Sequence, residues 1–365
     1  MFKTKVGYSV NPDSFKSGSE TATMAIDASS KLGLLFTSVV QDQKEIIKGV
    51  KSVNPDMPII GCTSSAAIVV PEAGYLANET GYSGMMTFGG NELLVGVAGS
   101  ERNGEPREIG KRIAREAIKK AGVKKVPSYF YMVASPKEEE EYLKGIQDVI
   151  GRVPMFGGSA ADNTVEGKWS IFVDDKVFSD GCAVAFFFAN NECKTAYTGA
   201  YQETKNVGII TKVEGKRKLV EIDGVPAVKK YAEWTGKTVE QLMGANLLTE
   251  TICAPLGVKD PLGDLIAVRH PMFANDDLSM NIGNNLAEGT AIMQLNGSVD
   301  GLLKANTDTI VELNQSMKKE IDGYFLVHCG GRRLGIALAG RENEIYDSIK
   351  KAAGNKPFLV VFTFG

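Results

Sequence analysis

The stretch "LGLLFTSVVQDQKEIIKGVKSVNPDMPIIGCTSSAA", residues 32–67, decides the fold class. The apolar run at 32–40 is typical of a buried strand, and 41–53 has the pattern of an amphipathic helix. A second apolar run, 57–70, reads as a strand that breaks into small residues. The stretch therefore predicts a strand, a helix and a strand in succession.

Helical patterns recur further along the first half of the chain. Residues 108–122 place Ile109, Ile113 and Ala117 on one face and end at Gly122, a residue that favours helix ends. We expect helix 108–122 to pack its apolar face on a neighbouring sheet.

A strand at 129–134 leads into another predicted helix. Ser135 is expected as its N-cap, with Pro136 at the first helical position and Glu138 completing a capping box. The acidic run at 138–141 is then a favourable charge cluster at a helix amino terminus, because the helix dipole is positive there.

The pattern changes in the second half of the chain. Residues 168–190 read as antiparallel strands with a turn at Asp174 and Asp175, and 216–236 as a strand, a turn and a helix opened by Pro226. Closely spaced strands and a helix at 298–319 follow. We predict an α+β fold of two domains, 1–195 and 196–365, each a mixed, largely antiparallel sheet packed with helices.

Composition excludes several classes of protein. The 365 residues are 43% hydrophobic and 23% charged, and the net charge of −3 with Lys and Arg spread along the chain gives no nucleic-acid or polybasic membrane surface. The amino terminus lacks the apolar region of a signal peptide, and no run approaches the roughly 18 apolar residues of a membrane helix. We expect a cytoplasmic protein with no membrane span and no nucleic-acid partner.

Metal and cofactor motifs are missing from the sequence. The five cysteines form no CxxC pair, and the chain has only two histidines, which leaves little from which to build a metal centre or a His-based catalytic triad. Neither Walker A nor dinucleotide-binding spacing occurs. We predict no metal and no cofactor.

Three glycine-containing segments are the candidate site. "IIGCTSSAA" (59–67) and "MFGGSAADN" (155–163) each send an apolar strand into small residues, where backbone N–H groups and hydroxyls can approach a ligand. The third, "HCGGRRLG" (328–335), is predicted to be a strand entering a glycine turn with two arginines. Packing of small residues under a helix is the competing interpretation for the first two.

Cys329 is the best candidate for a reactive thiol, since a nearby guanidinium favours the thiolate. Strand-end cysteines are nevertheless commonly inert, and His328 should point to the opposite face of the sheet from Cys329. Adjacency therefore does not make these two residues a catalytic dyad.

Together these segments resemble the FIST family of sensory proteins, which have a FIST amino-terminal and a FIST carboxy-terminal domain. The resemblance also rests on "LVEIDGVPAVKKYAEWTG" (219–236), and it covers most of the chain in the family's order. It implies a signal-input module, proposed for the family to bind small ligands such as amino acids and often joined to a signalling output. Where the family tends to have glycine, this chain has Ala66 and Ala67.

We therefore predict a sensor in preference to an enzyme, with an amino-acid-like small-molecule ligand and an unidentified output partner. Arg332 is expected to neutralise a ligand carboxylate and Asp162 to pair with an ammonium group, while donors near Ser64 and Ser159 hold the ligand's oxygens. Two alternatives stay open: an enzyme with Cys329 as nucleophile, and an interaction scaffold without a ligand. The predicted ligand-binding residues are Cys62, Thr63, Ser64, Gly157, Gly158, Ser159, Asp162, Cys329 and Arg332.

Overall fold

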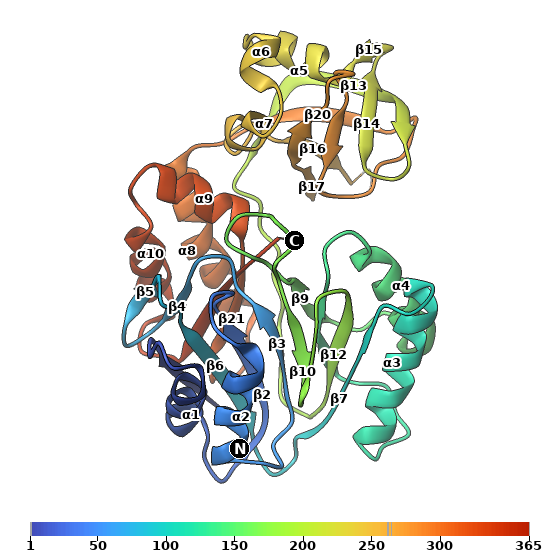
Figure 1. Ribbon diagram of the computed structural model, residues 1–365. Helices are drawn as coiled ribbons and strands as arrows, with labels where there is room; N and C mark the ends of the chain where they lie inside the picture. The colour runs from blue at the N-terminus through green and yellow to red at the C-terminus, as the bar shows by residue number, and fades with distance from the viewer. Residues whose placement is uncertain (1, 261–262, 264, 365) are drawn as a thin grey trace. The chain divides into compact units, whose positions relative to one another are not determined.

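A computed structural model describes residues 2–260, 263 and 265–364. The chain divides into two compact units (Figure 1). Unit 1 consists of Met1–Ala196, Ile310–Arg333 and Glu342–Gly365, and unit 2 of Tyr197–Thr309 and Leu334–Arg341. The domain boundary expected between residues 195 and 196 stays a prediction.

The first sheet of unit 1 is built around the strand–helix–strand stretch. β2 (Ser30–Thr37) and β3 (Ile59–Thr63) are joined by α2 (Gln43–Val53), in the predicted succession of strand, helix and strand, and the two strands pair in parallel. The second strand, expected at 57–70, is instead two strands, β3 and β4 (Ile68–Val70), and β4 belongs to another sheet. Asp42 caps α2 by accepting hydrogen bonds from the backbone N–H groups of Lys44 and Glu45. The complete strand order is β1 (Lys3–Ser9), β6 (Ser83–Gly89), β2, β3, β10 (Ile171–Val173) and β11 (Lys176–Phe178).

The second sheet of unit 1 has the order β7 (Leu94–Glu101), β12 (Gly181–Phe188), β8 (Tyr129–Ala134) and β9 (Met155–Ser159). A third has the order β21 (Tyr324–Cys329), β22 (Phe358–Thr363), β4 (Ile68–Val70) and β5 (Gly74–Leu76). The pairs β8–β9 and β21–β22 are parallel, whereas β12 and β4 pair with their neighbours in antiparallel fashion.

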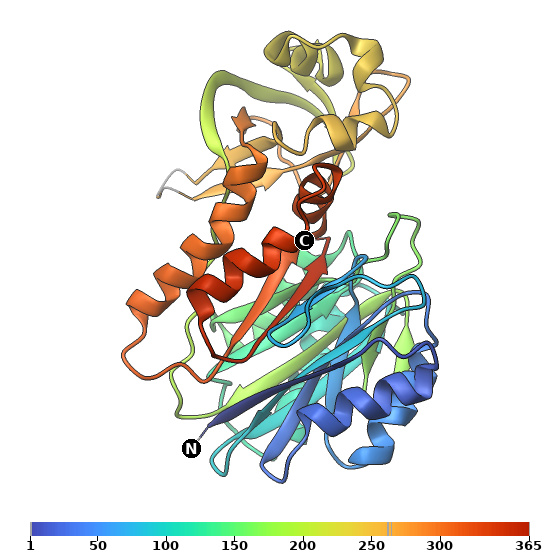
Figure 2. The ribbon, with the colours of Figure 1, turned by 90° about the vertical axis from the view of Figure 1, so that its left-hand side faces the viewer.

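Burial explains why the strands of unit 1 are apolar on both faces. Leu34 and Phe36 of β2 face a core shared with Tyr131 of the second sheet, while Leu35 faces the opposite core. That opposite core lies under α1 (Ser14–Ala25) and α2, and the outer face of the second sheet lies under α3 (Pro106–Lys120) and α4 (Glu139–Ile150) (Figures 1 and 2). Helices thus cover the outside of two facing sheets.

One predicted helix start is wrong. The helix expected to open at Ser135 and Pro136 begins at Glu139, and Glu138 is its N-cap without a side-chain hydrogen bond. The Ser135 hydroxyl instead donates to Asp180 at 2.6 Å, so it is not available as a cap. The acidic run does occupy the first turn of α4, as expected.

Unit 2 is a sheet with helices over one face. Its described strands follow the order β17 (Ile266–Arg269), β16 (Leu256–Lys259), β20 (Ala291–Asn296), β13 (Gln202–Glu214), β14 (Lys218–Ile222), β19 (Met280–Ile282) and β18 (Pro271–Ala274), and β15 (Val225–Pro226) pairs with β14. Its core joins the sheet to α5 (Ala227–Thr235), α6 (Val239–Leu242) and α7 (Asn246–Glu250). The α+β class with mixed, largely antiparallel sheets is confirmed.

Three further helices lie in the described part of the chain. α10 (Asn343–Ala353) belongs to unit 1, where the Tyr346 hydroxyl donates to the Pro71 carbonyl at 3.0 Å. α8 (Val299–Ser316) and α9 (Gly330–Leu338) each contain residues assigned to both units. The segment predicted as a glycine turn at 328–335 is therefore a strand end followed directly by a helix, because α9 begins at Gly330.

Candidate functional site

The loop after β3 is held by hydrogen bonds within unit 1. The Ser64 hydroxyl donates to the Ala67 carbonyl at 2.6 Å and accepts from the Phe362 N–H at 2.9 Å. The N–H groups of Ser64 and Ser65 donate to the carbonyls of Thr37 and Phe362. Cys62 and Thr63 are buried in β3. The loop's donors are thus engaged in holding β2, β22 and the loop together.

Backbone strain marks this loop. Ala66 has a φ of +62°, in the left-handed region that favours glycine, and its N–H donates to the Asn163 side-chain oxygen at 2.8 Å. This hydrogen bond ties the first small-residue segment to the second. The Ala161 N–H adds a second tie by donating to the Thr63 carbonyl at 3.1 Å.

The second segment uses its polar side chains to shape its own loop. Asp162 is only 1% exposed, and its carboxylate accepts hydrogen bonds from the backbone N–H groups of Thr164, Val165 and Lys168. The Ser159 hydroxyl donates to Glu139 at 2.6 Å, which joins the end of β9 to the start of α4. These contacts give Asp162 and Ser159 structural partners within unit 1.

Gly157 and Gly158 lie inside β9, paired with Met132 and Val133 of β8. Gly157 has a φ of +140°, and a Cβ at that position would lie 1.8 Å from the Met132 carbonyl oxygen. Glycine is therefore required here for the close approach of two strands.

The third segment meets the first through β22. His328 and Cys329 of β21 pair with Phe362 and Thr363, and the loop at Ser64 is hydrogen-bonded to the same Phe362. His328 is buried and Cys329 exposed, as the strand alternation predicts. The three segments are thus linked in unit 1: the first two loops directly, and the start of α9 through β22.

The first turn of α9 carries two arginines and no acidic residue. Arg333 is 9% exposed and donates from Nη1 to the Tyr75 hydroxyl at 3.2 Å, whereas its buried Nε has no hydrogen-bond acceptor among the described residues. No described carboxylate forms an ion pair with Arg333. The guanidinium therefore lies buried beside the hydroxyl group of Tyr75.

His328 stays neutral beside these arginines. Its Nδ1 donates to the Cys329 carbonyl at 3.0 Å, and its buried Nε2 has no partner among the described residues. Burial is the main cause that lowers the pKa of His328 to about 3, and the positive charge of Arg332 is the next. The ring packs against Phe362, which in turn packs against Tyr75, so His328 and Arg333 belong to one cluster.

Neither buried cysteine of the core is suited to thiolate chemistry. Burial raises the pKa of the Cys62 thiol, with a smaller opposing effect from a hydrogen bond with Tyr131, and burial also raises the pKa of Cys182. Cys329 is the exposed thiol nearest to the candidate site. In the described part of the chain, no three His, Cys, Asp or Glu side chains group as metal ligands would.

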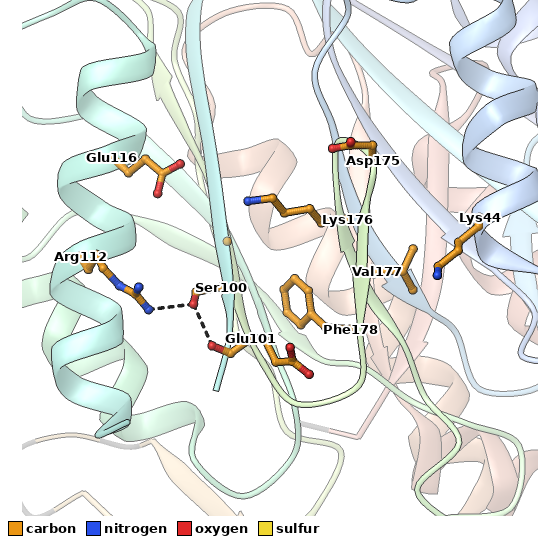
Figure 3. A pocket seen from close by; sticks show the side chains of 10 residues that line it. Lys44, Ser100, Glu101, Arg112, Glu116, Asp175, Lys176, Val177 and Phe178 are labelled. Carbon is orange, nitrogen blue, oxygen red and sulfur yellow. Dashed lines mark hydrogen bonds between the residues drawn. The ribbon is translucent and has the colours of Figure 1, made fainter. Parts of the chain in front are cut away.

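A separate cavity of about 490 Å³ opens elsewhere on unit 1 (Figure 3). Arg112 of α3 faces it, donating to the Ser100 hydroxyl at 2.8 Å, and Phe178 contributes an aromatic ring. None of the predicted site residues lines this cavity. Its charged groups have both signs and favour no class of ligand: Lys44, Arg112 and Lys176 against Glu101, Glu116 and Asp175.

The sequence analysis gave a binding role to Arg332 and none to Arg333, and the structure shows that Arg333 is the buried one of the two. The missing signal was the helix: once 330–338 is recognised as helical, Arg333 and Ile336 lie one turn apart on one face, and both are buried. The sequence "GGRR" alone could not show which of the two arginines is buried.

Comparison with known families fits this architecture. The FIST N domain matches residues 31–225 and the FIST C domain residues 227–365. The chain belongs to the FIST family, whose domains are associated with the sensing of small ligands in signal transduction. None of the described helices has the length and apolar character needed to cross a membrane. No curated protein matches the chain.

Three solved structures show distant likenesses to the chain. A cyanuric acid hydrolase from A. caulinodans aligns with a TM-score of 0.29 at 11% identity, over 58% of this chain and 72% of its own. A second cyanuric acid hydrolase gives 0.30 at 10%, over 82% and 100% of the two chains. Phosphoribosylformylglycinamidine synthase II from Thermotoga maritima gives 0.23 at 10%, over 100% and 69%. Likenesses this weak carry no argument.

Proposed function

We propose that this chain is a signal-input module that binds an amino-acid-like small molecule where its three glycine-containing segments are linked. The observation that carries the proposal is the start of α9: two arginines and two glycines in a helical first turn that has no acidic residue. Helix amino termini favour anions because their N–H groups and dipole are positive. A ligand carboxylate suits this end of the helix.

The loops after β3 and β9 support this end of the site. Their hydrogen bonds to one another and to β22 fix the strand ends, as a rigid scaffold must for a binding site. We assign Cys62, Thr63, Gly157 and Gly158 to this scaffold. The expected ligand contacts of Ser64, Ser159 and Asp162, and of Arg332 with the carboxylate, stay predictions.

A thermal-shift screen tests the proposal. Wild type, Arg332→Gln, Asp162→Asn and the control Arg115→Gln, an exposed arginine of α3, are compared against amino acids, dicarboxylates and nucleotides. A ligand at about 100 times its dissociation constant adds roughly 2.7 kcal/mol of stability, which raises the melting temperature clearly. We expect an amino acid to shift wild type and the control, and Arg332→Gln to respond less.

Asp162→Asn separates two roles of that carboxylate. A lower melting temperature with unchanged ligand response assigns Asp162 to the loop alone, whereas a lost response assigns it to the ammonium group. A screen in which no amino acid stabilises the wild type would contradict the proposed ligand class. The Cys329-dependent enzyme stays an alternative, although the His328 ring is buried and bonded to the next carbonyl.

A further inference from the structure

We propose that Arg333 and the amino-terminal turn of α9 form a binding site for a single oxyanion, either a carboxylate or a phosphate group. The inference rests on the proposed function for the position of the ligand. It goes further because it names the chemical group that is recognised, an oxyanion. It also assigns the main contact with that group to the buried Arg333 in place of Arg332.

The first argument is that the guanidinium of Arg333 has more hydrogen-bond donors than the described residues offer acceptors. A guanidinium has five N–H donors and stays charged in proteins. Arg333 is 9% exposed, yet the described residues offer it one hydrogen bond, to the Tyr75 hydroxyl, and no carboxylate. Buried charges are ordinarily paired, because an unpaired one loses its hydration without compensation. An oxyanion supplies both the negative charge and the acceptors.

The second argument is that no described group in the cluster is an acidic side chain. Tyr75 offers Arg333 a hydroxyl group, and Tyr82, which lies close enough to interact electrostatically with Tyr75 and Arg333, donates its own hydroxyl to the Ser64 carbonyl at 2.8 Å. His328 lies within the cluster as a neutral ring with its Nε2 unpartnered among the described residues. The first turn of α9 has no acid. Nothing described in the cluster therefore competes with an oxyanion for the guanidinium.

The third argument is the shape of the donors. The planar fork of a guanidinium matches the two oxygens of a carboxylate or phosphate in bidentate fashion. Gly330 and Gly331 precede Arg333 in the same first turn, where the backbone N–H groups of a helix have no intrahelical acceptors. The fork and these N–H groups are donors of the kind that anion sites at helix amino termini use.

The test titrates the full chain with acetate and, separately, with inorganic phosphate, at an ionic strength held constant with chloride. Binding is followed by calorimetry and by the ¹⁵N–¹H signal of the Arg333 side chain. We expect at least one probe to bind the wild type and to shift that signal. Arg333→Lys should bind it roughly 10- to 100-fold more weakly, since the charge remains but the fork is lost. The exposed-arginine variant Arg115→Lys should bind as wild type does.

Which probe binds decides between a carboxylate and a phosphate source. An unchanged affinity in Arg333→Lys, or no binding of either probe beyond the effect of chloride, would overturn the inference. Arg333→Met adds a readout for a purely structural role: a lower melting temperature together with a wild-type anion response means that Arg333 only packs. Amino-acid binding that is insensitive to Arg333 refutes this inference and leaves the proposed function standing. Phosphate binding that depends on Arg333, without any binding of amino acids, supports this inference and contradicts the proposed function.

Discussion

At the scale of single residues, two of the six described non-glycine residues with a positive φ lie in the loops after β3 and β9. Ala66 has a φ of +62° and Val165 a φ of +60°. Ala66 follows β3, and Val165 lies in the loop that the Asp162 carboxylate organises. Strained positions often cluster at functional sites, because the surrounding structure must hold them in place. Both loops belong to the segments that we assign to the scaffold of the ligand site.

Replacing Ala66 by glycine should therefore stabilise the protein. Glycine adopts a positive φ without the steric cost that alanine meets, so we expect Ala66→Gly to raise the free energy of unfolding by about 1 kcal/mol. Urea unfolding measures this change. The neighbouring Ala67 is buried without a positive φ, and Ala67→Gly is the control, expected to destabilise. Destabilisation by Ala66→Gly as well would contradict the strain argument.

At the scale of elements, α3 and α4 pack through glycines that no propensity rule would favour in a helix. A Cβ on Gly145 of α4 would lie 1.9 Å from the Arg107 carbonyl oxygen of α3, and one on Gly110 would lie 2.3 Å from the Tyr142 carbonyl oxygen. The two helix backbones therefore approach each other so closely at these points that only glycine fits.

Gly145→Ala measures which of two opposing effects is larger. Helix propensity favours alanine by roughly 1 kcal/mol, whereas overpacking of this kind typically costs about 1–3 kcal/mol. Because the clash is with backbone, we expect net destabilisation by about 2 kcal/mol in urea unfolding. Gly301→Ala in α8 is the control: its nearest atom would be 3.4 Å away, so propensity should prevail and the variant should be neutral or more stable. A stabilised Gly145→Ala would refute the close helix contact.

At the scale of the whole molecule, each unit contains one histidine that folding keeps neutral. Burial is the main cause that lowers the pKa of His328 in unit 1 to about 3 and that of His270 in unit 2 to about 4. In the unfolded chain both titrate near the ordinary value of about 6.5. Below that pH the unfolded state binds more protons than the folded state.

Stability should therefore fall as the pH drops below about 6.5. Each neutral histidine contributes at most about 1.4 kcal/mol per pH unit in this window, and the contribution is fully present above it. Urea unfolding between pH 7 and pH 5 measures the slope for wild type and His328→Gln. We expect a shallower slope in the variant, in a buffer without carboxylate or phosphate. Equal slopes would show that His328 is not held neutral by the fold.

The sequence by itself determined the elements that depend on local patterns. The apolar runs and helical spacing of residues 32–67 were enough to predict the succession of β2, α2 and β3, and strand alternation predicted that His328 and Cys329 lie on opposite faces of β21. The α+β class and the FIST family followed from the same segments. Local sequence is informative here because side-chain periodicity reports directly on which face of an element is buried.

Only the tertiary structure decided how the polar groups are used. Ser135 looked like a helix cap, but its hydroxyl bonds to Asp180, 45 residues further along the chain. Asp162 was predicted to pair with a ligand ammonium group; the structure shows that its carboxylate is buried and accepts hydrogen bonds from its own loop. Arg332 and Arg333 are adjacent in the sequence, but packing buries Arg333 more than Arg332. Hydrogen-bond partners and burial come from contacts between residues far apart in the chain, and no local pattern records those contacts.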